Sequence, residues 1–77
     1  MKIKTEKVKY LAKRTRTSPK TGNDYTLATF FDEKTYTKVD LFVTDECDFN
    51  GIKEGDLVHL ELSLNDRGNL NLANVYH

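Results

Sequence analysis

The sequence has a single cysteine, Cys47, a single proline and no tryptophan among its 77 residues. One cysteine forms no disulfide within the chain and supplies no thiolate metal cluster, so a reducing, cytoplasmic setting is the simplest interpretation. No stretch has the apolar core of a signal peptide or approaches the roughly 20 apolar residues of a membrane span. We therefore expect a soluble protein with no metal, no other cofactor and no membrane partner.

Net charge is also lacking, because 12 Lys and Arg balance 12 Asp and Glu. Taken alone, this neutrality speaks against nucleic acid, whose phosphates are bound mainly by clustered cations. The charges are segregated along the chain, however. Residues 1–20 hold eight bases and one acid, whereas residues 21–77 hold four bases and eleven acids. The sequence therefore carries an excess of seven positive charges at its beginning and of seven negative charges over the rest.

Motifs that carry catalysis are missing as well. The sequence contains no Gly-rich phosphate loop, no HExxH or GxSxG pattern and no EF-hand loop. His59 has no second metal ligand in register with it, and the acidic neighbours of Cys47 disfavour a thiolate. A chain of 77 residues buries only about 60% of the surface that it exposes when unfolded, which leaves little room for a deep pocket. We predict a protein that is not an enzyme.

What the sequence does contain is a series of strand-like segments. Residues 2–14 mix β-branched, aromatic and basic residues without Gly or Pro, and we interpret them as a long, bent strand rather than a basic helix. A basic loop, residues 15–24, follows with the turn formers Pro19 and Gly22. Residues 25–31 and 36–43 then form a predicted hairpin.

Alternation along this hairpin predicts which side chains point inward. In the second strand Val39, Leu41 and Val43 share the inner face, while Tyr36, Lys38, Asp40 and Phe42 share the outer one. In the first strand Leu27, Thr29 and Phe31 are the expected inner set and Phe30 the outer residue. The adjacent Phe30 and Phe31 leave this register open by one residue.

The second half of the chain predicts a short helix and a second hairpin. Thr44 is a suitable N-cap and Gly51 a suitable C-terminal stop, so residues 44–51 are expected to be helical, with Phe49 and Ile52 closing one end of the core. Residues 57–64 alternate cleanly and form the expected fourth strand. The turn 65–68 leads into a last strand through Leu70, Leu72 and Val75.

Five strands with one short helix between the third and fourth predict a single all-β domain over residues 1–77. The Gly-rich entry 51–56, the alternating strand 57–64, the turn 65–68 and the outward aromatics together resemble the OB-fold, a five-stranded Greek-key barrel. An SH3-like small barrel is the alternative. With its size and its basic first strand and loop, the chain resembles the small single-stranded-DNA-binding proteins of phages, plasmids and conjugative elements.

This resemblance implies a ligand that lies across the outer face of strands two and three, bordered by the first loop and the last turn. Binding a single strand requires cations for its phosphates and aromatic rings for its bases. The candidate residues are Lys13, Arg14, Arg16 and Lys20 on or beside the first loop, Lys38, Phe30, Tyr36 and Phe42 on the outer face, Arg67 in the last turn, and Tyr25. The alternative for each aromatic is a place in the core, and for the lysines of residues 2–9 a role in protecting a sheet edge.

We predict non-catalytic binding of single-stranded nucleic acid, DNA in preference to RNA, in a replication or mobile-element context. A protein-interaction module is the alternative. In that case the acidic segment from Asp45 to Asp56 docks a basic protein, or the oppositely charged segments of two copies pair into a homo-oligomer.

Overall fold

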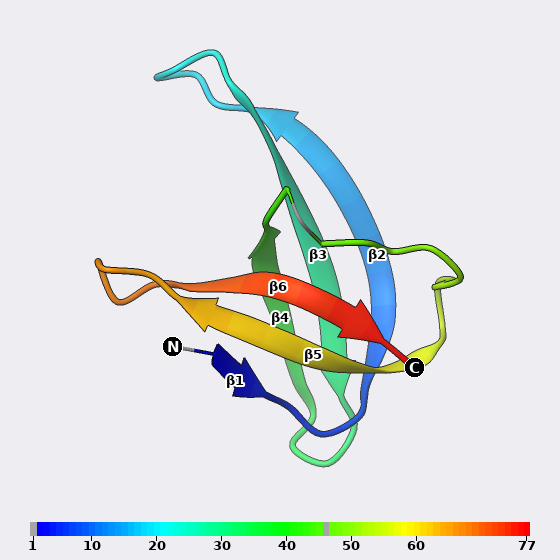
Figure 1. Cartoon of the computed structure of the whole chain (residues 1–77). Coiled ribbons are helices and arrows are strands. Elements are labelled where there is room, and N and C mark those ends of the chain that lie inside the picture. The colour runs from blue at the N-terminus through cyan, green and yellow to red at the C-terminus, as the bar shows by residue number, and fades with distance from the viewer. Residues whose placement is uncertain (1, 46) are drawn as a thin grey trace.

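The computed structural model describes residues 2–45 and 47–77, and these residues form six strands and no helix (Figure 1). The strands are β1 (Lys2–Lys4), β2 (Val8–Thr17), β3 (Asp24–Asp32), β4 (Thr37–Val43), β5 (Leu57–Leu64) and β6 (Leu70–Tyr76). Within this part of the chain no helix has the length and apolarity needed to cross a membrane.

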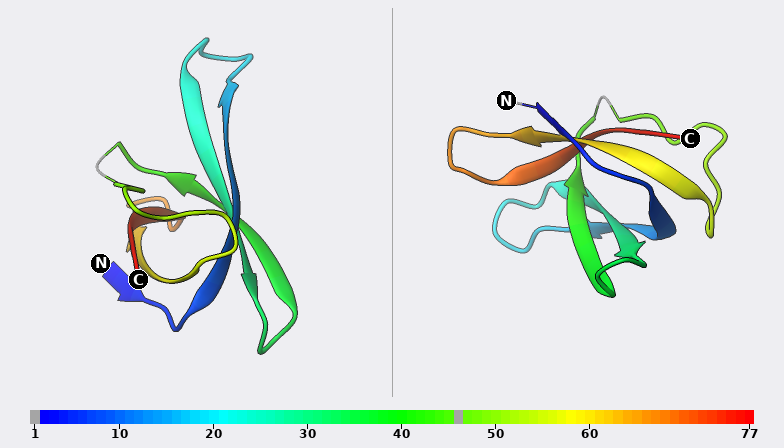
Figure 2. Two further views of the ribbon diagram at one scale, coloured as in Figure 1. Left: turned by 90° about the vertical axis from the view of Figure 1, so that its right-hand side faces the viewer. Right: turned by 90° about the horizontal axis from the view of Figure 1, so that it is seen from below.

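Five of the strands close into a barrel. Strands β2, β3 and β4 pair in sequence as antiparallel neighbours, and β5 returns to pair with the first of them, which gives the Greek-key order β5-β2-β3-β4. Strand β6 then fills the gap between β5, to which it is antiparallel, and β4, to which it is parallel. Figure 2 shows the β2–β3 hairpin standing away from the β5–β6 hairpin. The all-β barrel predicted from the sequence is confirmed.

The predicted first strand, residues 2–14, is two strands. Both lie along the same edge of β5: β1 pairs at Lys4↔Glu61 and β2 at Val8↔Val58. Between them the Thr5 amide donates to the Leu60 carbonyl (2.9 Å) and the Thr5 hydroxyl accepts from the Leu60 amide (3.1 Å). A threonine side chain therefore takes the place of a backbone partner, and the regular ladder breaks there, so the barrel carries β1 as a sixth strand that the sequence analysis did not separate.

The core lies between the two hairpins, and its largest fully buried side chains are Phe30, Leu72 and Val58. The other buried apolar residues are Tyr10, Ala28, Leu41, Leu60, Leu62 and Val75. Strand β5 matches the predicted bounds and alternation. Phe49 and Ile52 pack against the core, as expected.

The helix predicted for residues 44–51 is wrong for all of these residues that the structure describes; Glu46 lies outside them. The segment instead forms turns, in which Cys47 donates to the Thr44 carbonyl and Ile52 to the Phe49 carbonyl. The Asp48 carboxylate accepts from the Asn50 amide (2.9 Å), a local bond that competes with helical pairing.

The prediction that Phe30 faces outward is also wrong, since its side chain is fully buried. The pairs Phe30↔Val39 and Phe31↔Lys38 place Phe30 on the inner face and Phe31 on the outer one. Leu27, Thr29 and Phe31, the expected inner set, therefore lie on the outer face. A register shift of one residue moves every side chain of a strand to the opposite face of the sheet, so a single error in register misplaced all three residues.

Candidate nucleic-acid interface

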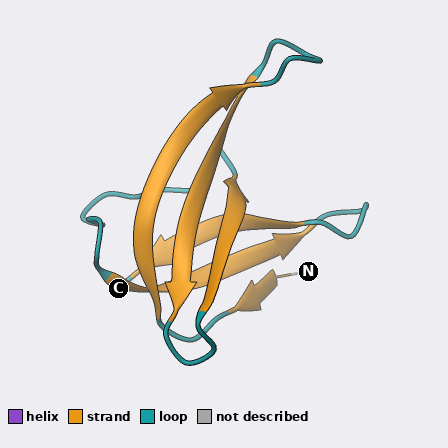
Figure 3. Cartoon of the chain, turned by 180° about the vertical axis from the view of Figure 1, so that it is seen from behind, coloured by secondary structure: helices purple, strands orange, loops and turns teal. Residues whose placement is uncertain are grey.

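The outer face of β2, β3 and β4 is the surface on which the structure gathers most of the candidate residues. In Figure 3 these three strands lie in front of the β5–β6 hairpin. Paired residues on neighbouring strands point to the same side, and the register pairs Arg16 with Tyr25, and Arg14 with Leu27. Leu27 in turn pairs with Phe42. Two arginines and two aromatic rings therefore share one face.

Tyr25 and Phe42 form an aromatic pair on this face. Their ring centroids are 5.6 Å apart and their planes are inclined by 57°. Phe42 keeps 53% of its surface in contact with solvent, which is unusual for a large apolar side chain in a protein with so small a core. Tyr25 is half-buried and supports the Phe42 ring from the neighbouring strand. The Phe42 ring is therefore accessible to an unstacked base, and Tyr25 packs against it at an inclined angle.

Arg14 is tied to an acid on the same face. Its guanidinium lies 3.5 Å from the Asp40 carboxylate, and both side chains are close to half exposed. The Thr29 hydroxyl donates to the same carboxylate, so side chains from both β2 and β3 contact Asp40 on β4. Arg14 is thus positioned beside the aromatic pair, but part of its charge is already compensated.

A second aromatic pair lies toward the other end of this face. Phe31 and Tyr36 meet edge to face with centroids 5.7 Å apart, and Lys38 is the β4 partner of Phe31. Tyr36 lies in the β3–β4 turn, where its backbone φ is 55° and its side chain is 85% exposed. Tyr25 and Phe31 are six residues apart on β3, so the two pairs are separated by about 20 Å along the strand.

Four of the predicted residues lie elsewhere, and one of them is Phe30, which is fully buried in the core. Lys13 pairs with Ala28 on the inner face, and its ammonium group lies 4.5 Å from the centroid of the Phe49 ring. It therefore points away from Arg14 and Arg16, which follow it in the sequence. Lys20 and Arg67 are exposed in the β2–β3 loop and the β5–β6 turn, outside the strands that carry the aromatic pairs.

The β5–β6 turn is well defined by its own hydrogen bonds. The Asn65 side-chain oxygen accepts from the amides of Arg67 and Asn69, both at 2.9 Å. Gly68 follows with a φ of 82°, the left-handed conformation that such a hairpin turn requires. This fixed backbone presents Arg67 at the tip of the hairpin.

Sequence reasoning missed the polar continuation of the face across the barrel. Phe42 pairs with Asn71 on β6, Asn71 with Ser63 on β5, and Ser63 with Lys2 on β1. The parallel contact between β4 and β6 joins segments almost 30 residues apart, and no local pattern in the sequence announces it. Sequence reasoning also missed Phe31, because it expected this side chain on the inner face. The register of β3 against β4 places it on the outer face.

Residues 45 and 47–56 of the acidic segment lie in the connection between β4 and β5 (Figure 1). The Asp56 carboxylate accepts from the Lys53 amide (2.9 Å) and lies 3.1 Å from His77 Nε2. These two contacts lower the pKa of Asp56. Burial raises the pKa of the Cys47 thiol, so the thiolate is disfavoured there.

Among the described residues no three His, Cys, Asp or Glu side chains gather as a metal site would require. Comparison with protein-family models, with curated proteins and with solved structures finds no match to this chain. We therefore infer function from the geometry of the outer face.

Proposed function

We propose that the protein binds single-stranded nucleic acid, with DNA favoured, on the outer face of β3 and β4. The observation that carries this proposal is the accessible Tyr25–Phe42 pair with Arg14 and Arg16 on the adjacent strand. Rings of this kind stack on bases of any sequence, and the flanking cations follow the phosphates, so binding is sequence-tolerant. A replication or mobile-element setting is part of the proposal and rests on the resemblance of the sequence to small single-strand binders.

The strand order supports an OB-fold assignment. The Greek key β5-β2-β3-β4, closed by β6, is the arrangement of a five-stranded Greek-key barrel, and β3 and β4 are then the second and third strands of that barrel. OB-folds bind oligonucleotides on this face, bordered by the loops that here contain Lys20 and Arg67. The described residues contain no helix, which departs from the predicted pattern. In this respect the barrel resembles the SH3-like alternative, which has no helix either.

Net neutrality does not oppose this function. Each base stacked on an aromatic ring contributes about 1–3 kcal/mol, and the face offers two pairs of rings. Arg14, Arg16 and Lys38 supply cations on the same face, although Arg14 must partly exchange Asp40 for a phosphate. The acids of residues 45–56 that the structure describes lie in the β4–β5 connection and not on strands β2, β3 or β4.

The test is fluorescence anisotropy with a labelled oligo-dT, repeated with oligo-U. We expect saturable binding. The logarithm of the association constant should fall linearly with the logarithm of the salt concentration, with a slope of about −0.7 for each phosphate contacted. Phe42→Ala should weaken binding at least fivefold, since it removes the most accessible stacking surface. Binding that is absent, or that does not change with salt, contradicts the proposal.

The matched control is Tyr76→Ala. Tyr76 is an exposed aromatic that stacks on His59 on the far hairpin, with ring centroids 6.0 Å apart. It resembles Phe42 in exposure but lies outside the proposed face, so its loss should leave the affinity for oligo-dT unchanged.

A further inference from the structure

A cavity of about 380 Å³ opens between the two hairpins, on the inner side of the barrel wall. It is lined by the apolar side chains Val8, Phe30, Val39, Leu41, Leu60, Leu62 and Leu70. Val39 and Leu70 are each about two-fifths exposed, so the cavity is accessible from solvent. Its volume falls at the lower end of the range for small-molecule sites.

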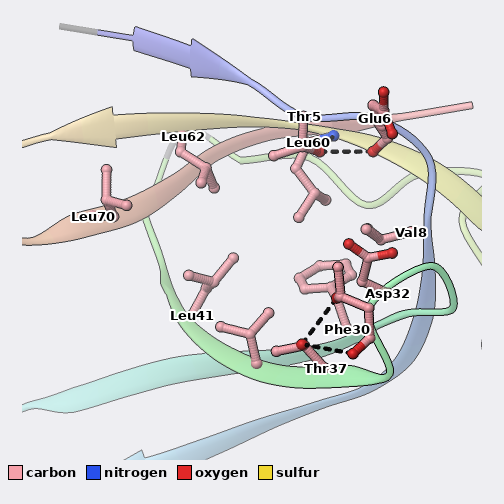
Figure 4. A pocket seen from close by; sticks show the side chains of 12 residues that line it. Thr5, Glu6, Val8, Phe30, Asp32, Thr37, Leu41, Leu60, Leu62 and Leu70 are labelled. Carbon is pink, nitrogen blue, oxygen red and sulfur yellow. Dashed lines mark hydrogen bonds between the residues drawn. The ribbon is translucent and has the colours of Figure 1, made fainter.

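The cavity exists because β4 leaves the barrel wall. Strand β4 pairs with β6 only at Phe42 and Val43, so the β4 segment 37–41 has no partner on that side among the described residues. The wall is open along this segment, and the inward side chains of β4 face those of β5 and β6 across the gap (Figure 4). The opening lies on the inner face and is therefore distinct from the surface that carries Tyr25 and Phe42.

Apolar and charged side chains lie at opposite ends of the cavity. Figure 4 shows Leu41, Leu62 and Leu70 at one end, while Glu6 and Asp32 lie at the other. Glu6 is already paired with Lys34, whose ammonium group lies 2.6 Å from it. Asp32 accepts a hydrogen bond from the Lys34 amide (2.9 Å), but no salt bridge involves it among the described residues. The charge of Asp32 also acts on the Lys34 ammonium group, so two carboxylates share one cation beside an apolar chamber.

We propose that this cavity binds a primary aliphatic amine, with the alkyl chain among the leucines and the ammonium group on Asp32. The apolar lining favours burial of a short alkyl chain. The excess negative charge of Glu6 and Asp32 over Lys34 favours a cation over a neutral or anionic head group of the same size. The proposal does not depend on nucleic-acid binding, because it uses the inner face of the barrel.

The probe is hexylammonium chloride, compared with hexanol and sodium hexanoate in an NMR titration of the methyl-labelled protein. We expect saturable shifts of the Val39, Leu41 and Leu62 methyl groups, with affinities in the order hexylammonium, hexanol, hexanoate. The preference for hexylammonium over hexanol should be about three- to fivefold at low salt, the range of a partly exposed ion pair. Equal affinity for all three probes, or shifts that do not saturate or that lie elsewhere, overturns the proposal.

Two variants sharpen the test. Asp32→Asn keeps an oxygen to accept from the Lys34 amide, removes the charge, and should abolish the preference for hexylammonium while leaving hexanol binding unchanged. Glu33→Gln removes the same charge from the adjacent position, whose side chain does not line the cavity and pairs with Lys9, and should leave the preference intact. If both variants reduce the preference equally, the carboxylate of Asp32 is not the recognition group.

Discussion

Arg14 and Asp40 form an ion pair 3.5 Å long on the same face as the exposed Phe42 ring. The two residues lie 26 positions apart and meet only because β3 separates their strands and brings both to its outer side. The arginine best placed to contact a phosphate beside the aromatic pair is therefore held by an acid. This acid should oppose nucleic-acid binding, because it competes with phosphate for Arg14.

Asp40→Asn should tighten the binding of oligo-dT. The amide oxygen still accepts from the Thr29 hydroxyl, so the local structure is kept, while one negative charge leaves the face and Arg14 is released. Exposed ion pairs contribute about 0.2–1 kcal/mol, which corresponds to a gain in affinity of up to about fivefold. Anisotropy at low salt measures it. Asp45→Asn, an equal change in the acidic segment, is the control, and a weaker complex with Asp40→Asn would count against the proposed face.

Arg16→Ala and Lys13→Ala should differ, although both remove a cation near the end of the same strand. Arg16 pairs with Tyr25 on the outer face, whereas Lys13 points inward over the Phe49 ring. Arg16→Ala is expected to weaken binding and to reduce the magnitude of the salt slope by about 0.7, the value for one phosphate contact with a single strand. Lys13→Ala should leave the slope unchanged. Equal salt slopes for the two variants would contradict the assignment of a phosphate contact to Arg16 and not to Lys13.

Phe30→Ala and Phe42→Ala should separate stability from binding. Phe30 is fully buried, so its truncation should lower the free energy of unfolding by about 3–5 kcal/mol. Phe42 keeps half its surface in water, and its truncation should cost about 1 kcal/mol or less. Chemical denaturation of the two variants measures both values. A larger loss from Phe42→Ala would mean that the register of β3 and β4 is the reverse of the one described.

Acid should destabilise the protein through Asp56 and Glu61. Bonds from the Lys53 amide and from His77 lower the pKa of Asp56, and a bond from Asn74 is the main cause that lowers the pKa of Glu61. A carboxyl group with a lower pKa in the folded state stabilises that state above its unfolded-state pKa, and this contribution is lost as the pH falls through the folded-state pKa.

The melting temperature should therefore fall as the pH drops below about 4, the range of unperturbed carboxyl groups. Asp56→Asn should make this fall shallower, because one of the two groups no longer titrates. Thermal unfolding followed by circular dichroism between pH 7 and pH 3 measures the effect. A steeper fall in the variant would contradict the linkage assigned to Asp56.

Local patterns predicted the elements whose signals are local. The alternation from Leu57 to Leu64 defines β5, since a strand with one buried face needs apolar residues at every second position. Gly68 marks the following turn because its positive φ is costly for other residues. Phe49 and Ile52 reach the core as expected, even though the segment that carries them is not a helix.

The sequence by itself determined an all-β chain with a basic beginning, and tertiary structure decided how that chain presents its side chains. Either Phe30 or Phe31 satisfies the alternation of β3, and only packing against Val58 and Leu72 in the closed core selects Phe30 for burial. The parallel pairing of Phe42 with Asn71, the ion pair of Arg14 with Asp40 and the cavity beside the open edge of β4 likewise depend on contacts between distant segments. Closure of the barrel fixes all of these at once, because each strand's register depends on its neighbours on both sides.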